Sequence, residues 1–255
     1  MHFSCKYLIS TLYLLTFILS NNTNANELSV MSWNVYFDDI SGQSRYPKII
    51  DTISKHQADI ICLQEATDSF IKKITNSSLR QQYQFINISG SQQYRNIILT
   101  KIKETHSGII KLPTNMNRLA VYINLKINNN PIQLINVHLD SMTDDTELRI
   151  EQLQTILGHD KTMENLILCG DLNFGDDDKE NKFTIERFKD SAGNNKTTSY
   201  NVTENKLARK TKFMFEESRR LDRILVRGKM ATKKYQLFSY PYSDHYPILS
   251  TIQIN

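Results

Sequence analysis

Ser243-Asp244-His245-Tyr246-Pro247 stands directly before the apolar run at residues 248–252. This stretch places a carboxylate and an imidazole side by side at the entry to an expected strand. Upstream, further short motifs likewise place a carboxylate, carboxamide or imidazole at one end of an apolar run. They are Ser32-Trp33-Asn34, Leu63-Gln64-Glu65, Asn136-Val137-His138-Leu139, Gly170-Asp171-Leu172-Asn173 and Arg220-Leu221-Asp222-Arg223. Because strand ends meet at the rim of a sheet, the motifs predict a sheet-based protein with one polar site at a rim.

The length and composition predict one globular domain after a removable leader. The chain has 255 residues, of which 40% are hydrophobic and 23% charged, which suffices for a domain with a full core. Lys6 precedes an apolar stretch at residues 7–19, and a polar step and Thr23-Asn24-Ala25 follow. This order is typical of a secretory signal peptide, and about 13 apolar residues are too few to cross a hydrocarbon core. We expect a signal peptide over residues 1–25, one domain over residues 26–255, and a secreted or periplasmic protein.

The mature chain keeps two cysteines, and each lies in an apolar strand-like run. Cys62 lies within Ile60-Ile61-Cys62-Leu63, and Cys169 ends Leu166-Ile167-Leu168-Cys169. We expect both to be small buried hydrophobic side chains, with a bridge between neighbouring strands left open.

Hydrophobic periodicity predicts strands that alternate with helices around a strand-rich middle. Residues 28–34 and 60–64 are expected strands, and residues 45–56 an amphipathic helix. Residues 119–127 and 132–139 form an expected β-hairpin with its turn at residues 128–131. Residues 145–157 are an expected helix that Gly158 ends. Further strands are expected at residues 166–169, 221–226 and 248–252, so the pattern indicates a two-sheet α/β sandwich.

The polar motifs contain the groups that phosphodiester hydrolysis needs: a base for water, a hard cation and hydrogen-bond donors. Glu65 supplies an oxygen ligand of the kind Mg²⁺ prefers. Asn34 can give a carbonyl oxygen to the metal or an N–H to phosphate. Asp171 and Asn173 are two residues apart, so on an extended segment both point the same way, one toward water and one toward phosphate. Taken alone, their tripeptide also fits an ordinary turn.

His245 and His138 differ in the residues that surround them in the sequence. His245 beside a carboxylate is expected to stay protonated near a phosphate, and Asp222 is the expected holder. Asp244 is adjacent to it. His138, at the end of the expected hairpin, is a second candidate imidazole for the leaving group, although a structural role is the alternative there.

The ordered set of motifs resembles the endonuclease/exonuclease/phosphatase superfamily, which includes pancreatic-type deoxyribonucleases, exonuclease III-like abasic endonucleases, sphingomyelinases and type 2 tyrosyl-DNA phosphodiesterases. The resemblance covers residues 28–255. It implies a four-layer α/β sandwich of two mixed β-sheets flanked by helices, as in exonuclease III and deoxyribonuclease I. It also implies a phosphodiesterase with one principal Mg²⁺, for which Mn²⁺ is a possible substitute.

When the roles of the superfamily's motif residues are transferred to this sequence, the resemblance implies that Glu65 and Asn34 bind the metal. Asp244 either adds to the metal site or fixes His245. Asn34 also lies among the expected substrate-binding residues.

The same resemblance implies that Asp171 positions or deprotonates water. Asn173 and His245 stabilise the transition-state phosphate, Asp222 orients His245, and His138 matches members with histidine at that strand end. Asn173 and His138 therefore contact substrate as well.

Within the superfamily, the type 2 tyrosyl-DNA phosphodiesterases are the most similar branch. His138-Leu139-Asp140-Ser141 and residues 220–225 carry that similarity. Two positions depart from it: the aspartate expected two residues after Asn34 is Tyr36, with Asp38 and Asp39 only nearby, and an expected arginine is Gly175. Residues 34–36 and 243–247 also resemble secreted bacterial sphingomyelinases.

Charge favours a polyanionic substrate. Between residues 206 and 234 there are eleven basic residues and three acidic ones, on a chain of net charge +4. Arg209 and Lys210 are the expected contacts to nucleic acid, and a loop balanced by Asp176-Asp177-Asp178 is the alternative. We expect a monomeric nuclease-like enzyme without stable membrane insertion. A phospholipid head group, as in a sphingomyelinase or phosphoinositide phosphodiesterase, is the alternative substrate.

Overall fold

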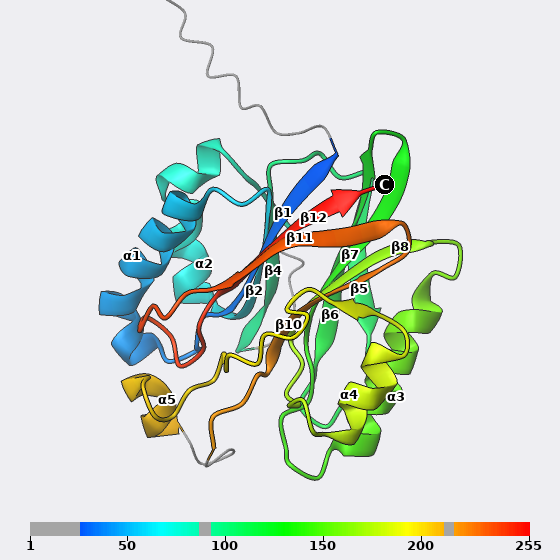
Figure 1. Cartoon of the computed structure of the whole chain (residues 1–255). Helices are drawn as coiled ribbons and strands as arrows, with labels where there is room; N and C mark the ends of the chain where they lie inside the picture. The colour runs from blue at the N-terminus through cyan, green and yellow to red at the C-terminus, as the bar shows by residue number, and fades with distance from the viewer. Residues whose placement is uncertain (1–25, 87–92, 212–216) are drawn as a thin grey trace, which may run out of the picture.

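The computed structural model describes residues 26–86, 93–211 and 217–255. The expected signal peptide, residues 1–25, lies outside the described residues. Two six-stranded sheets form the centre of the fold (Figure 1). In spatial order, the first contains β11 (Met230–Leu237), β12 (Ile248–Ile254), β1 (Glu27–Asn34), β2 (Ile60–Thr67), β4 (Tyr94–Thr100) and β3 (Gln84–Ile86). The second contains β5 (His106–Lys111), β6 (Leu119–Ile127), β7 (Asn130–His138), β8 (Asn165–Asp171), β10 (Asp222–Arg227) and β9 (Lys189–Asp190).

Helices cover the outer faces of the two sheets on opposite sides of the molecule (Figure 1). The first sheet carries α1 (Asp39–His56), α2 (Asp68–Thr75) and the short 3₁₀ turn η1 (Ser78–Gln81), and the second carries α3 (Thr146–His159) and α4 (Lys179–Ile185). The short helix α5 (Lys206–Thr211) lies beyond the strand ends. The predicted four-layer α/β sandwich is confirmed. No helix in the described part of the chain is long and apolar enough to cross a bilayer.

Three apolar layers hold the sandwich together, because both faces of each sheet are covered. Val30 and Cys62 point into the layer between the sheets, together with Ile123 of the second sheet. Trp33 and Leu63 point the other way, toward α1 and α2. A separate layer packs α3 against the second sheet. Burial on both faces explains why the strands read as continuous apolar runs rather than as strict alternation.

Two parallel strand pairs bring the polar motifs to one rim. β1 pairs with β2 and β7 pairs with β8, and the register places Asn34 opposite Gln64 and His138 opposite Asp171. Each parallel pair is joined by a helical crossover, α1 or α3, so the carboxyl ends of all four strands point to the same edge. The fold therefore assembles the site from segments about 140 residues apart in sequence.

The helix predicted over residues 45–56 begins six residues earlier, at Asp39. Asp38 caps it by accepting from Ile40 N at 2.9 Å. Pro47 lies inside the helix. The earlier first turn is stabilised by this cap, which the apolar periodicity of residues 46–53 does not report.

Two expected boundaries were wrong by a few residues. Gly158 lies within α3, whose capping residue is Asp160. The hairpin turn uses Asn128 and Asn129, which have positive φ angles of 48° and 66°, so Pro131 belongs to β7. Asparagine tolerates this left-handed conformation, and paired positive φ angles match the twist of a tight hairpin.

Cys62 and Cys169 are free and fully buried in the layer between the sheets. The expectation of small buried hydrophobic side chains is confirmed. Burial, with the neighbouring Cys169 thiol, raises the pKa of Cys62 well above its ordinary value, so it stays a neutral thiol.

Candidate active site

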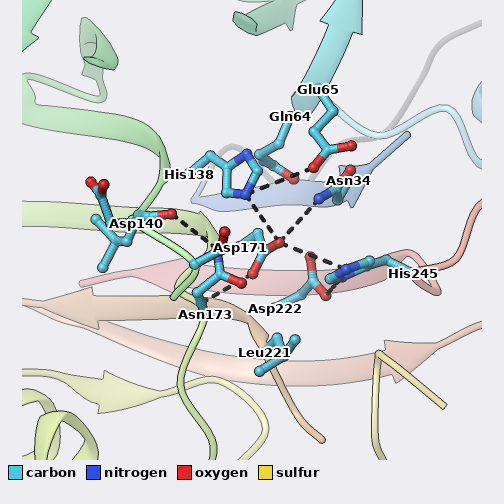
Figure 2. A network of polar contacts seen from close by, with 12 residues as sticks. Asn34, Gln64, Glu65, His138, Asp140, Asp171, Asn173, Leu221, Asp222 and His245 are labelled. Carbon is cyan, nitrogen blue, oxygen red and sulfur yellow. Dashed lines mark hydrogen bonds and ion pairs between the residues drawn. The ribbon is translucent and has the colours of Figure 1, made fainter. Parts of the chain in front are cut away.

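Asp171 is the centre of the polar cluster at the rim (Figure 2). Its Oδ2 accepts a hydrogen bond from Asn34 Nδ2 at 3.0 Å. The same oxygen lies 3.5 Å from His138 Nε2 and 3.7 Å from His245 Nε2. The sequence-predicted residues Asn34, His138, Asp171 and His245 therefore converge, although they come from four different strands or strand-flanking segments.

The backbone before Asp171 requires glycine. Gly170 has φ of +143°, and a Cβ there would lie 1.9 Å from the carbonyl oxygen of Val137 on the neighbouring strand β7. The close approach brings the ends of β7 and β8 together, so that His138 and Asp171 share one register position. Any side chain at residue 170 would push these two catalytic candidates apart.

Glu65 enters the site through a β-bulge. It does not end β2, as expected, because the strand continues to Thr67; the pairing with β4 shifts between Leu63 and Ala66. Glu65 itself has φ of 57°, an uncommon conformation for a residue with a side chain. The bulge re-aims the carboxylate toward the rim, where Oε1 lies 3.9 Å from His138 Nε2 and Oε2 accepts from Phe37 N at 3.0 Å.

The protonation of Glu65 indicates that a cation is suited to this position. Burial, together with the charge of Asp244, raises its pKa to about 7. Two buried carboxylates in electrostatic contact repel each other unless a cation lies between them. With the Asn34 carbonyl oxygen they form a set of hard oxygen ligands, which fits a divalent cation such as Mg²⁺.

His245 and Asp222 form a tight pair behind Asp171. His245 Nδ1 lies 2.7 Å from Asp222 Oδ2, and both side chains are buried. Burial alone would lower the pKa of His245, but the charges of Asp222 and Asp171 hold that pKa well above its ordinary value. The expected protonated imidazole held by Asp222 therefore has the geometry it needs. Trp33 Nε1 also donates to the His245 carbonyl oxygen at 2.9 Å, which ties this segment to the core.

Asp171, Asp222 and His245 also lie close enough to share a cation. However, the imidazolium already stands between the two carboxylates and neutralises them. Burial raises the pKa of Asp171, yet the charge of His245 and the hydrogen bonds from Asn34 and Asn173 outweigh it and hold that pKa below its ordinary value. We therefore interpret these three residues as a proton-holding unit, and the placement of the cation at Glu65, Asn34 and Asp244 stays a prediction.

His138 has the opposite protonation state. Burial and the neighbouring Arg118 lower its pKa well below the ordinary histidine value. Arg118 Nη1 lies 3.0 Å from His138 Nδ1. Because a guanidinium can only donate, Nδ1 accepts and the single proton of the neutral imidazole lies on Nε2, facing Asp171 and Glu65. His138 is thus a neutral donor in the site and has a specific partner there.

Sequence reasoning missed Arg118 and Arg45. Arg118 precedes β6 at the same rim, and a cation directly before an apolar strand was the signal available for it. Arg45 is buried and donates to the carbonyl oxygens of Val35, Tyr36, Asp38 and Tyr242. It holds the loop after β1 against the segment that leads to Asp244 and His245. No sequence signal distinguishes this arginine from others on an amphipathic helix.

Asn173 differs from expectation in backbone conformation. It has φ of 56°, so residues 171–173 are not extended. Its backbone N donates to Asp171 Oδ1 at 3.1 Å and its Nδ2 donates to Leu139 O at 2.9 Å. The turn alternative therefore describes the backbone, and Asn173 fixes the orientation of Asp171 as well as lying beside it.

Asp38 and Asp39 do not replace the carboxylate missing at Tyr36. Asp38 caps α1, and Asp39 accepts hydrogen bonds from Tyr46, Thr67 and Ser69. Both are committed to the start of α1. The predicted metal ligands therefore remain Asn34, Glu65 and Asp244, and Asp244 accepts hydrogen bonds from Ser243 and Thr211.

Three arginines of the basic segment at residues 206–234 are neutralised inside the fold. Arg220 and Arg223 pair with both Asp176 and Asp190, and Arg219 pairs with Asp178. The alternative of a loop balanced by residues 176–178 therefore holds for these arginines. The guanidinium of Arg219 also lies against Gly175, 3.1 Å from the position of an added Cβ.

The two basic residues expected to contact substrate are on the surface of α5. Arg209 donates to the carbonyl oxygens of Val202 and Thr203, and Lys210 is exposed. The expected contact between these residues and nucleic acid stays a prediction. Lys212, part of the same basic run, lies outside the described residues.

A family model described as the Endonuclease/Exonuclease/phosphatase family matches residues 31–245. The chain therefore belongs to this family of phosphoester hydrolases, as the motifs predicted, and divalent-metal dependence is typical of it.

Among curated relatives, the 5′-tyrosyl-DNA phosphodiesterase of Caenorhabditis briggsae is 28% identical over 165 residues, covering 60% of this chain and 46% of the relative. Tyrosyl-DNA phosphodiesterase 2 of Xenopus laevis is 24% identical over 255 residues, covering 90% of this chain and 67% of the relative. The predicted similarity to the type 2 branch is confirmed. The chain spans about half the length of several of these relatives.

Solved structures agree on the fold. The TDP2 of Danio rerio, in complex with a single-strand DNA product, aligns with a TM-score of 0.77 at 22% identity, covering 89% of this chain and 99% of that chain. An endonuclease/exonuclease/phosphatase from Bacteroides vulgatus aligns with a TM-score of 0.74 at 16% identity, covering 90% and 99%. At these identities the likeness supports the four-layer architecture.

Proposed function

We propose that this protein is a Mg²⁺-dependent phosphodiesterase that hydrolyses phosphodiester bonds in nucleic acid. The observation that carries the proposal is the contrast of the two imidazoles around Asp171, one charged and one neutral. A carboxylate that stays ionised between them can accept a proton, while the imidazolium offsets negative charge on a phosphate.

Each residue has one role in this proposal. Asp171 orients the attacking water and accepts its proton, because its lowered pKa keeps it ionised at neutral pH. His245 donates to a nonbridging phosphate oxygen, and Asp222 is a positioning residue that keeps it protonated. His138 donates through Nε2 to the substrate oxygen that faces it.

The metal would be held by Glu65, Asn34 and Asp244. When bound, a divalent cation neutralises charge on the nonbridging oxygens and lowers the pKa of bound water. Glu65 lies within range of His138 Nε2, so the metal site and the neutral imidazole face the same space. Asn34 joins this set to Asp171 through its amide.

Nucleic acid is proposed as substrate because the matched relatives are named for tyrosyl-DNA phosphodiester chemistry and one structural neighbour contains a single-strand DNA product. The proposal also includes export of the protein by residues 1–25, with removal after Ala25. The N-terminal sequence of protein collected outside the cytoplasm tests that part.

A substrate panel tests the proposed activity. Purified protein should hydrolyse a single-stranded oligonucleotide in Mg²⁺ or Mn²⁺, and EDTA should abolish the turnover. Sphingomyelin and phosphoinositide are included as competing substrates. Efficient hydrolysis of either lipid without cleavage of DNA or RNA at low salt would replace the nucleic-acid proposal with the lipid alternative.

A further inference from the structure

A cleft of about 680 Å³ opens beside His138. Its walls come mainly from the start of β4, the end of β5 and the loop before β6, so it extends the site toward the second sheet. Asn96 on β4 donates to the carbonyl oxygen of Leu119 on β6 at 2.9 Å, which joins the two sheets at this point. We name this feature the His138 cleft.

The described residues that line the His138 cleft include three cations, Arg95, Lys111 and Arg118, and no acidic residue. Arg95 pairs with Asp68 at 2.6 Å. Lys111 is exposed and makes no ion pair with any described residue. The cleft therefore carries positive charge that the fold does not neutralise locally.

Arg118 is a buried cation whose guanidinium has an unsatisfied hydrogen-bond donor among the described residues. It is 6% exposed, and its Nη1 contacts two neutral groups, His138 Nδ1 at 3.0 Å and Tyr94 Oη at 3.3 Å. Its Nε is buried and makes no hydrogen bond to any described residue. A buried guanidinium without a carboxylate in hydrogen-bond contact is costly, and an anionic ligand would supply the missing acceptor.

The opposite side of the site differs in this respect. Arg219 and Arg220 also line a surface hollow, but each pairs with an aspartate. An anion entering there would have to displace an existing ion pair. In the His138 cleft, the added anion meets unpaired positive charge at Lys111.

We propose that the His138 cleft binds a second phosphate group of the substrate, contacted by Lys111 and Arg118. The inference rests on the proposed function. It deepens that function, because the bond hydrolysed then has a further nucleotide on its His138 side. The substrate is accordingly a polynucleotide with at least one further phosphodiester beside the bond hydrolysed, and a neutral aryl or lipid head group would leave the cleft cations unpaired.

Binding in EDTA tests the cleft without requiring turnover. The affinity of a fluorescein-labelled single-stranded 12-mer is measured by anisotropy over a range of salt concentrations. Lys111→Ala should weaken binding about tenfold and reduce the salt slope by about 0.7, the value for one phosphate contact on a single strand. Lys111→Arg should retain both. The matched control is Lys126→Ala, an exposed lysine at the far end of the same hairpin sheet, opposite Pro131, which should change neither.

Turnover separates the inference from the proposed function. In Mg²⁺, Lys111→Ala should cleave the 12-mer with about tenfold lower kcat/KM, yet hydrolyse thymidine 5′-(p-nitrophenyl phosphate), which has a single phosphate, at the wild-type rate. The inference is overturned if Lys111→Ala binds like Lys126→Ala, or if the wild type hydrolyses the nitrophenyl ester but no internal linkage. If neither substrate is hydrolysed in Mg²⁺ or Mn²⁺, the proposed function fails, while the anisotropy still decides whether the cleft binds phosphate.

Discussion

The two sides of Asp171 use positive charge differently. On the His245 side the imidazolium stands between Asp171 and Asp222, and the arginines of β10 and the preceding loop pair with aspartates of the loop after β8 and of β9. On the His138 side the imidazole is neutral, and Arg118 and Lys111 have no carboxylate in ion-pair contact among the described residues. On the His245 side the positive charges are paired within the fold, whereas on the His138 side they can pair with a bound anion.

This difference shows why a count of charges along the chain does not locate a substrate. Residues 206–234 carry the densest basic run in the sequence, yet its arginines at 219, 220 and 223 hold loops in place. The cleft beside His138 contains fewer cations, but Lys111 and Arg118 are not used for internal pairs. Local pairing, rather than local number, decides whether a basic region can bind a polyanion.

Substitutions on the His245 side should reduce the catalytic rate more than substitutions on the His138 side. His245→Ala and Asp222→Asn should each lower kcat by about a thousandfold, and the double variant should lose little more, because the two residues act as a unit. Steady-state kinetics on the nitrophenyl ester measure this. Asp222→Asn should also recover part of its activity as pH is lowered, since loss of the carboxylate lowers the pKa of His245. Additive losses and an unchanged pH profile would contradict the pairing.

Removing one arginine from each side should separate catalysis from stability. Arg118→Ala should lower kcat about a hundredfold with a modest change in stability, because its partners His138 and Tyr94 are neutral. Arg220→Ala should lower the free energy of unfolding by about 3 kcal/mol, because Asp176 and Asp190 lose a buried partner. Urea denaturation and turnover of both variants make the comparison. Equal stability losses would remove the distinction between the two sides.

The metal position should show in the pH dependence of stability. The pKa of Glu65 is raised in the folded protein to about 7 from an ordinary value of 4.5, so folding favours its protonated form. Stability from this group is complete below pH 4.5 and is lost as pH rises to about 7, by about 3 kcal/mol in EDTA at most. Glu65→Gln should flatten this dependence, and Mg²⁺ should restore stability more at pH 8 than at pH 5. Denaturation at these pH values measures it, and an identical pH profile in Glu65→Gln would place the titrating group elsewhere.

Much of the fold and the site could be predicted from sequence, because apolar runs with polar ends report strands and rims. Asn34, Asp171, Asp222 and His245 were found in this way, and they converge. The rest depends on three-dimensional context. The bulge that turns Glu65 into the site comes from a register shift with β4, and nothing in Leu63-Gln64-Glu65 indicates it.

The roles of Arg118 and Arg45 could not be predicted from the sequence for a related reason. Their importance comes from partners in distant segments: Arg118 contacts His138, and Arg45 contacts carbonyl oxygens of residues 35 and 242. An isolated arginine carries no sign of such contacts. Likewise, the pairing of Arg220 with Asp176 and Asp190 is visible only when β9 and β10 are side by side.

We propose that Asp171, ionised between a charged and a neutral imidazole, activates water for phosphodiester hydrolysis. The decisive measurement is single-turnover cleavage of a labelled oligonucleotide at saturating Mg²⁺, by the wild type and by Asp171→Asn. We expect Asp171→Asn to remain folded, to bind the oligonucleotide normally and to cleave it at least about a thousandfold more slowly. Cleavage by Asp171→Asn within tenfold of the wild-type rate would contradict it.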